Sequence, residues 1–436
     1  MTAMGTVTGV PRSTMAVLML SVFTVSLGFG IVLPSLPFLI ERLLGPSGDA
    51  VQVSRATGLL TGLYMLSLFL FASLWGRLSD KVGRRAILLI GLIGFSATSL
   101  TFAFVENLPA IYVERFLSGL FAAAVTPVAL AAIGDLAATE AARARRLTFV
   151  SLAGIGGFLL GPMLGVFVAR TAFTLIPGTS GLGPLVIPLA GTAALALLVA
   201  IAAMLTIPGE TAIGCGARHA QPAVPAAKRL VTKLLALAFI ASAGIGVFEV
   251  GLALRGKQEL GLNPYQIATM FTECSLVMVV VQAIVFSPWI KPETTRWFIL
   301  PAFAILAVAL FLVPLASDFR LMLLVIGAVA ASAGILSPIL TFWISSKAGK
   351  AQGAELGKQT AAASLGAAVG SAAGGLLYNV AWLPNASFVL VASVTVVAAI
   401  LSLSLPSKLV VRKHVAGPGP IRAADPSPIS ISLNPR

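Results

Sequence analysis

The sequence predicts an all-α integral membrane protein, with twelve transmembrane helices arranged as two pseudo-symmetric bundles of six. Composition is the first reason: 58% of the 436 residues are hydrophobic and 10% are charged, whereas soluble domains carry about 25% charged residues. The second reason is the length of the apolar runs. Each is close to the roughly 20 residues that a helix needs to cross a bilayer, and each is too long and continuous for a strand of a membrane barrel.

Twelve apolar runs can be placed between clusters of charged residues. The first exceeds the roughly 7–15 apolar residues of a cleaved signal, so it is expected to remain as the first helix. Each run is predicted to be helical because the bilayer core offers no partner for free backbone groups. The expected spans are 15–40, 57–76, 86–105, 109–134, 147–169, 183–207, 231–254, 264–290, 297–315, 320–345, 356–380 and 386–405.

Basic residues predict the orientation of these helices, because cytoplasmic loops are enriched in Lys and Arg. Most of the 29 basic residues lie on one side, which also carries both ends of the chain. We therefore expect a multi-pass protein of the cell (inner) membrane with cytoplasmic termini. Topology and contact with the lipid bilayer account for the net charge of +14, so no nucleic-acid partner is expected. The opposite side carries only Arg42, Arg55, Arg170, Arg255, Lys257 and Arg320.

The polar stretch at 208–229 divides the chain into two halves. It is predicted to be a cytoplasmic linker between an N-terminal six-helix bundle, residues 1–207, and a C-terminal six-helix bundle, residues 230–405. Residues 406–436 are rich in Pro, Ser and Gly and are predicted to form a disordered cytoplasmic tail.

An internal repeat supports this division. The string SLGFGIV at 26–32 is similar to SAGIGVF at 242–248. Glycines spaced four apart, which begin at Gly157, recur in the same spacing from Gly366. Both matches are displaced by roughly 210 residues, as expected for two copies of one helical unit.

The loop after the second predicted helix reads GRLSDKVGRR, residues 76–85. Two glycines, an acid at a helix end and a cluster of arginines suit a loop that grips a neighbouring helix in one state and releases it in another. The segment resembles the loop signature of the major facilitator superfamily, which implies that superfamily's fold. The resemblance also implies that the aspartate and the arginines join a charge network that stabilises the outward-facing state. A plain basic loop is the alternative, and the matching positions are Gly76, Asp80, Gly83, Arg84 and Arg85.

The fifth predicted helix contains GFLLGPMLG, with Gly157, Gly161, Pro162 and Gly165. Small residues every four positions let two helices approach closely, and the proline bends the helix. The string resembles the signature of the twelve-helix drug/proton antiporter branch, although Val166 stands where a second glycine is usual. The resemblance implies export; packing glycines without directional meaning are the alternative.

The first predicted helix ends with Gly28, Gly30, Pro34 and Pro37. This end is similar to the N-terminal half of tetracycline-type exporters. Those exporters carry an acid shortly before the glycines, and residues 24–27 here contain none. Tetracycline is therefore not the expected substrate.

Arg115 is a basic residue two turns inside the fourth predicted helix. An arginine at this depth costs at least ~2.5 kcal/mol and should face an aqueous cavity or a partner. It resembles the family's helix 4 arginine, which is associated with proton transfer. The alternative is that Arg115 reaches the outer interface or pairs with Glu114.

Two acids, Glu249 and Glu273, lie well inside predicted helices of the second half. A carboxylate at such a site can exchange protons or bind a cation, so both are candidates for proton coupling. Either could instead be a structural acid paired with Arg255 or Lys257.

Five polar or amphipathic residues within the spans are candidates for lining a central cavity. The alternative for each is a hydrogen bond that packs one helix on another. The candidates are Tyr64, Gln282, Trp343, Gln359 and Asn379.

Together these features predict a secondary active transporter that exports a small hydrophobic compound by alternating access, coupled to protons. The expected partners are the compound, protons and lipid, for a monomer without cofactor or metal. No nucleotide-binding motif is present in the sequence, so an ion gradient is expected to drive transport. Uptake or facilitated transport of a metabolite, nutrient, metal ion or chelate is the alternative. A membrane-embedded enzyme is a further alternative, but the sequence shows no acidic or histidine motif at helix ends, so no enzymatic activity is expected.

Overall fold

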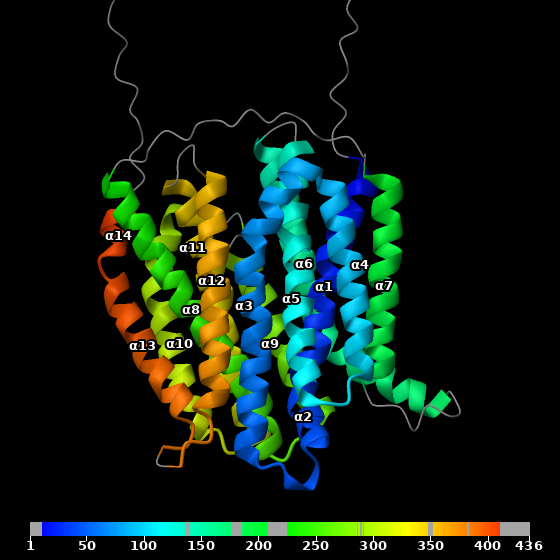
Figure 1. The fold of residues 1–436 in the computed structure, drawn as a ribbon. Coiled ribbons are helices and arrows are strands. Elements are labelled where there is room, and N and C mark those ends of the chain that lie inside the picture. The colour runs from blue at the N-terminus through cyan, green and yellow to red at the C-terminus, as the bar shows by residue number, and fades with distance from the viewer. Residues whose placement is uncertain are drawn as a thin grey trace, which may run out of the picture.

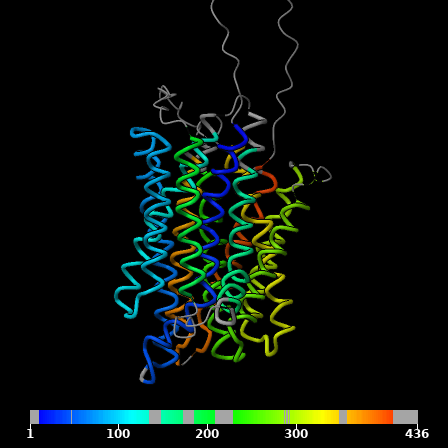
Figure 2. The backbone as a smooth tube through the Cα atoms, turned by 90° about the vertical axis from the view of Figure 1, so that its right-hand side faces the viewer, coloured from blue at the N-terminus to red at the C-terminus, as the bar shows by residue number. Residues whose placement is uncertain are grey.

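The computed structural model of the chain describes residues 11–136, 140–175, 185–207, 225–285, 287, 290, 292–347, 352–381 and 383–409. Helices run side by side along one common direction, and α1 and α14 have their free ends on the same end of the molecule (Figures 1 and 2). Most of the predicted linker, residues 208–224, and of the predicted tail, residues 410–436, lie outside the described residues.

The first half of the chain provides six spans. The first is interrupted, because α1 passes through the short 3-10 turn Leu33–Ser35 into α2, where Pro34 and Pro37 lie at or near the junctions. A proline removes a backbone donor and fixes φ, so the helix cannot continue straight through. The helices are α1 (Arg12–Val32), α2 (Leu36–Leu44), α3 (Ala50–Val82), α4 (Arg84–Phe104), α5 (Leu108–Leu136), α6 (Glu140–Leu175) and α7 (Val186–Thr206).

The second half provides another six. Eleven of the described helical segments are long and apolar enough to cross a membrane. The twelfth, α12, is rich in Gly and Ala and has Glu355, Lys358 and Gln359 near its start, which lowers its hydropathy. It nevertheless runs along α8 and α3 (Figure 1), so the predicted twelve-helix fold is confirmed. The helices are α8 (Pro225–Gln258), α9 (Pro264–Val285), α10 (Ile299–Leu312), α11 (Phe319–Lys347), α12 (Gln352–Leu376) and α13 (Ala386–Ser402), followed by the short α14 (Leu405–Lys408).

The predicted repeat is present in three dimensions as a repeated helix pair. In the first bundle α6 packs on α1, and a Cβ at Gly161 would lie 2.7 Å from the carbonyl oxygen of Leu27. In the second bundle α12 packs on α8, and a Cβ at Gly370 would overlap the carbonyl oxygen of Ala243. Only glycine permits such close backbone approach between membrane helices.

The two bundles meet toward the end of the molecule that carries few basic residues. There α3 packs on α12 and α6 on α9. Gly62, in the first half of α3, faces the carbonyl oxygen of Ala368 on α12. Farther along α3, the apolar side chains of Leu70, Leu74 and Val82 are exposed. We call the end with few basic residues the outer end and the opposite one the basic end.

Candidate functional site

A cavity of about 410 Å³ lies between the two bundles. Residues of α1, α3, α5 and α6 line it on one side, and residues of α8, α9 and α11 line it on the other. This volume is in the range of small-molecule sites. Because both bundles contribute to its wall, a rocking motion of one bundle against the other would change access to it.

Five aromatic side chains form part of this wall. Phe29 stacks between Tyr64 and Phe158, with ring centroids 5.1 Å and 5.8 Å apart, and Phe248 and Phe271 contribute from the second bundle. Stacked rings present flat apolar faces and a negative π-surface. The wall therefore suits an apolar or cationic guest.

Two glycines of α1 position Phe29. A Cβ at Gly28 would lie 2.7 Å from the ring of Phe95 on α4, and a Cβ at Gly30 would lie 3.0 Å from the carbonyl oxygen of Phe158 on α6. These close contacts hold α1 tightly against its neighbours. Phe29, between the two glycines, lines the cavity.

Glu249 on α8 is the one charged side chain among the described residues that line the cavity. Its carboxylate has no hydrogen bond or ion pair with any residue that the structure describes. The pairing with Arg255 or Lys257 considered above is not formed, because those cations bind Glu259 and Glu41 instead. Glu249 is therefore free to take up a proton or to bind a cation that enters the cavity.

Glu273 on α9 lies at a different place. It does not line the cavity, although Cys274, the next residue, does. Its Oε1 atom lies 3.8 Å from the position of a Cβ at Gly327 on α11, and its Oε2 atom is buried without a hydrogen bond among the described residues. The structure thus separates the two predicted acids: Glu249 is at the cavity and Glu273 is against α11.

Arg115 forms the pair with Glu114 that was one of the two expectations for it. Its Nε and Nη2 atoms donate to the two carboxylate oxygens at 2.7 Å and 3.0 Å, and the residues are 4% and 3% exposed. The guanidinium also lies 4.2 Å from the ring centroid of Phe102 and 5.7 Å from that of Tyr64. Arg115 is therefore a buried, neutralised residue behind the aromatic wall.

Two of the five cavity candidates, Tyr64 and Gln282, line the cavity. Tyr64 belongs to the stack around Phe29, and Gln282 lies one helical turn beyond Met278, another lining residue of α9. Each supplies a polar group to a wall that is otherwise largely apolar.

The structure places the other three candidates elsewhere, as a correction to the prediction. Trp343 is buried and donates from Nε1 to Thr295 at 3.1 Å. Gln359 donates to Thr341 on α11 at 2.7 Å. Asn379 lies beyond the end of α12, at the outer end of the molecule. These three side chains form hydrogen bonds with other helices and loops and do not line the cavity.

Comparison with known proteins agrees with this architecture. A family model for the Major Facilitator Superfamily matches residues 18–354 and 234–430. The chain belongs to this superfamily. It is 28% identical over 376 residues to Multidrug resistance protein 1 of Bacillus subtilis (strain 168), covering 84% of this chain and 90% of that protein. It is 26% identical over 373 residues to Quinolone resistance protein NorA of Staphylococcus aureus (strain COL), covering 84% and 89%. The crystal structure of the human organic anion transporter MFSD10 matches with a TM-score of 0.65 at 20% identity, covering 90% and 99%.

The signature segment of this major facilitator transporter, residues 76–85, was expected to be a loop but is almost entirely helical: it comprises the end of α3, Gly83 and the start of α4, at the basic end. Gly83 has φ +102° and ends α3, donating its N–H to Ser79, so that α4 can begin at the next residue. Other residues adopt this φ only with strain. Asp80 is 60% exposed and pairs with Arg84 at 2.6 Å. Gly76 has open space where a Cβ would lie, and Arg85 is half-buried.

The antiporter-like string of α6 forms the face that packs on α1. A Cβ at Gly157 would overlap the carbonyl oxygen of Phe23, and one at Gly165 would lie 3.1 Å from Ile31. Pro162 lies inside α6 beside Gly30. Since the glycines of α12 pack on α8 in the same way, close helix packing accounts for the spacing; its meaning for direction stays a prediction.

The sequence did not predict which phenylalanines line the cavity, of which there are four, or the ion pair that joins the two bundles at the outer end. Nothing in the sequence distinguishes the lining residues among its 24 phenylalanines, because side-chain facing depends on how the helices rotate in the bundle. Lys257 stood out in the sequence as a basic residue on the side where basic residues are few, but its partner across the bundles, Glu41, was not predicted.

Proposed function

We propose that this superfamily member exports a small, hydrophobic and preferably cationic compound in exchange for protons. The observation that carries the proposal is the unpaired Glu249 carboxylate in an aromatic cavity. One carboxylate can be neutralised either by a proton or by a cationic guest, so the two compete for it. The printed names of the relatives, which refer to multidrug and quinolone resistance, support export.

The geometry supports an alternating-access cycle that starts from an inward-facing state. If the basic end faces the cytoplasm, as the distribution of Lys and Arg predicts, the contacts at the outer end close the cavity to the outside. A cytoplasmic compound would then displace the proton from Glu249. After the bundles rock, a proton from outside would displace the compound. Exchange of one proton for one monovalent cation moves no net charge, so the pH gradient alone drives it. When the exported compound is neutral, a proton that crosses 100 mV contributes ~2.3 kcal/mol, enough for a gradient of roughly fiftyfold.

The same proposal includes the organisation expected from the sequence. The bundles would comprise residues 1–207 and 230–405, joined by the cytoplasmic linker 208–229 and followed by the tail 406–436. Both termini would be cytoplasmic, and a single chain would carry out the cycle because both walls of the cavity belong to one chain.

The test is reconstitution in liposomes that contain a pH-sensitive dye, with an inward gradient of a lipophilic cation. Antiport requires the lumen to become alkaline as the compound enters. Acidification would indicate symport and would overturn export. Flux without a pH change would indicate a uniporter and would show that transport is not coupled to protons.

A further inference from the structure

The last turn of α8, together with Glu259 directly after it, carries polar residues on two different faces. Arg255 and Glu259 are four residues apart and therefore lie on one face, whereas Lys257 and Gln258 lie between them on another. The first face is turned toward the second bundle, and the other toward the first bundle. This turn is at the outer end, where the bundles meet.

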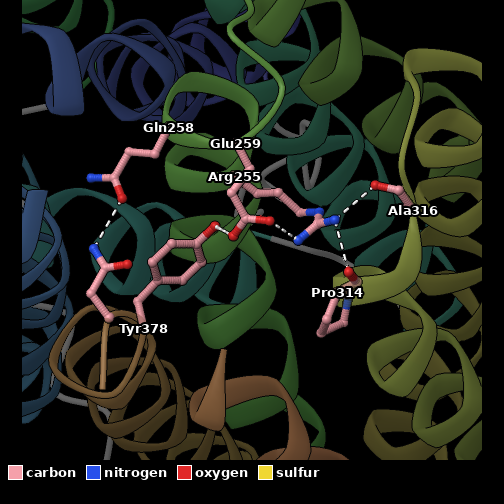
Figure 3. A network of polar contacts seen from close by, with 7 residues as sticks. Arg255, Gln258, Glu259, Pro314, Ala316 and Tyr378 are labelled. Atoms are coloured by element: carbon pink, nitrogen blue, oxygen red, sulfur yellow. Dashed lines mark hydrogen bonds and ion pairs between the residues drawn. The ribbon is translucent and has the colours of Figure 1, made fainter. Parts of the chain in front are cut away.

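The face turned toward the second bundle is anchored by a polar network in which Arg255 and Tyr378 are buried (Figure 3). Arg255, which is 4% exposed, donates from Nη2 to the carbonyl oxygens of Pro314 and Ala316, both at 2.8 Å, and pairs through Nη1 with Glu259. Glu259 in turn accepts from the Tyr378 hydroxyl at 2.7 Å. Burial and this hydrogen bond raise the pKa of Tyr378, so the phenol stays a donor. The network ties α8 to the loops that follow α10 and α12.

The other face grips the first bundle through Lys257. Its ammonium donates to the carbonyl oxygen of Pro37 at 3.0 Å and pairs with Glu41 at 2.5 Å. It also lies 5.1 Å from the ring centroid of Phe38. Three groups of α2 thus surround one cation of α8, whose side chain is 10% exposed.

A second set of hydrogen bonds joins α8 and the residues after α12 to the first bundle, at the start of α3. Gln258 and Asn379 donate to the same acceptor, the carbonyl oxygen of Ala50, at 3.1 Å and 3.0 Å. Asn379 also donates to Gln258 at 3.0 Å. Asn379 directly follows Tyr378, so the polar network that fixes Tyr378 also places Asn379.

We propose that Lys257, Gln258 and Asn379, together with Glu41 and the Ala50 carbonyl, form an outer clasp that holds the cavity closed to the outside. Arg255, Glu259 and Tyr378 are positioning residues that keep the clasp rigid. The helix break at Leu33–Ser35 leaves α2 as a separate segment, so α2 can stay on α8 or leave it. Opening at the outer end requires the clasp to release α2 and α3. The direction of this opening rests on the proposed function.

Cys274 provides a native reporter, because it lines the cavity and is the only other cysteine besides Cys215. In the full chain with Cys215→Ser, a membrane-impermeant thiol reagent added outside intact cells should modify Cys274 only when the outer end opens. Lys257→Gln removes a charged hydrogen-bond donor and should speed modification about tenfold. Glu41→Gln changes a residue that is 61% exposed, so it is not expected to affect folding, and should speed modification about threefold.

The matched control is Arg320→Gln, which removes an exposed cation of the outer end on α11. Its modification rate should equal that of the parent. The exchange Glu41→Lys with Lys257→Glu should return the rate toward the parent value. Tyr378→Phe should raise the rate in the parent but add little in Lys257→Gln, because both act through one clasp.

An unchanged rate in Lys257→Gln, or an equal increase in Arg320→Gln, would overturn the clasp. The modification rate of Cys274 does not depend on transport. If the liposome assay failed while the variants changed this rate as expected, the proposed function would be wrong and the clasp would stand. Fast modification of the parent from outside would instead overturn the assigned orientation.

Discussion

Gly58 on α3 and Gly375 on α12 touch across the boundary between the two bundles. A Cβ at Gly58 would lie 2.5 Å from the Cα of Gly375, so the two backbones are in direct contact. In a membrane, close packing of small residues is a main source of helix association. The outer closure therefore depends on backbone contact as well as on the polar clasp at the ends of the same helices.

Replacement of Gly375 by alanine is expected to impair this closure. The new Cβ would overlap the carbonyl oxygen of Ser54, and forcing the helices apart costs about 1–3 kcal/mol. We expect transport in liposomes to fall about tenfold and Cys274 to become more accessible from the outer end. Gly191→Ala on α7, where a Cβ would meet open space, should behave as the parent. Normal transport by Gly375→Ala would show that the outer end still closes when α3 and α12 are forced apart.

Asp80→Asn is expected to slow the exchange between states without changing the cavity. Asp80, in the last turn of α3, is exposed and pairs with Arg84 at the start of α4, and such surface pairs contribute about 0–1 kcal/mol. The melting temperature and the substrate dissociation constant should therefore stay near the parent values while turnover falls. Binding by equilibrium titration and transport in liposomes, measured on one preparation, separate these effects. Unchanged turnover would show that residues 76–85 have no role in the exchange between states, as the alternative of a plain basic segment implies.

The twelve spans could be predicted from the sequence because hydropathy reports directly on the solvent around a helix. Even α12, whose Gly and Ala content lowers its hydropathy, is predicted as an apolar run between charged clusters, and its glycine spacing matches that of α6. The packing of Gly366 on α8 explains why this spacing is informative: glycine every four residues leaves one face of a helix without side chains.

The cavity could be predicted only in part, because a residue's place in a span does not fix the direction of its side chain. Tyr64 and Trp343 are both large aromatic residues inside spans, yet Tyr64 lines the cavity and Trp343 is buried against Thr295. The difference follows from helix rotation and from loop contacts far apart in the sequence. The hydrogen-bond partners of Arg255 could not be predicted for the same reason, because its guanidinium donates to the loop after α10, which is distant in the sequence.

The Arg115 and Glu114 pair is expected to act on stability. Arg115→Met would leave the Glu114 carboxylate buried without its partner, at a cost of about 3–5 kcal/mol. The melting temperature of the purified protein should fall clearly. Glu114→Gln added to Arg115→Met removes both charges and should recover most of the loss. A role in proton transfer would give the opposite pattern, with normal stability in Arg115→Met and lost coupling in both variants.

Glu249→Gln is expected to abolish proton coupling while the cavity keeps its shape. Glutamine has nearly the same size but neither carries the charge nor exchanges the proton, and no other charged side chain among the described residues lines the cavity. We expect the alkalinisation of the liposome lumen to disappear and the affinity for a permanently charged lipophilic cation to fall about tenfold, since a buried charge needs a partner. Binding of a neutral compound should be unchanged, because the aromatic wall remains. Glu293→Gln, which removes an exposed acid at the basic end, is the matched control and should retain both signals. If Glu249→Gln still moved protons with substrate, coupling would have to pass through another acid, and Glu273 on the neighbouring α9 would be the residue to change next.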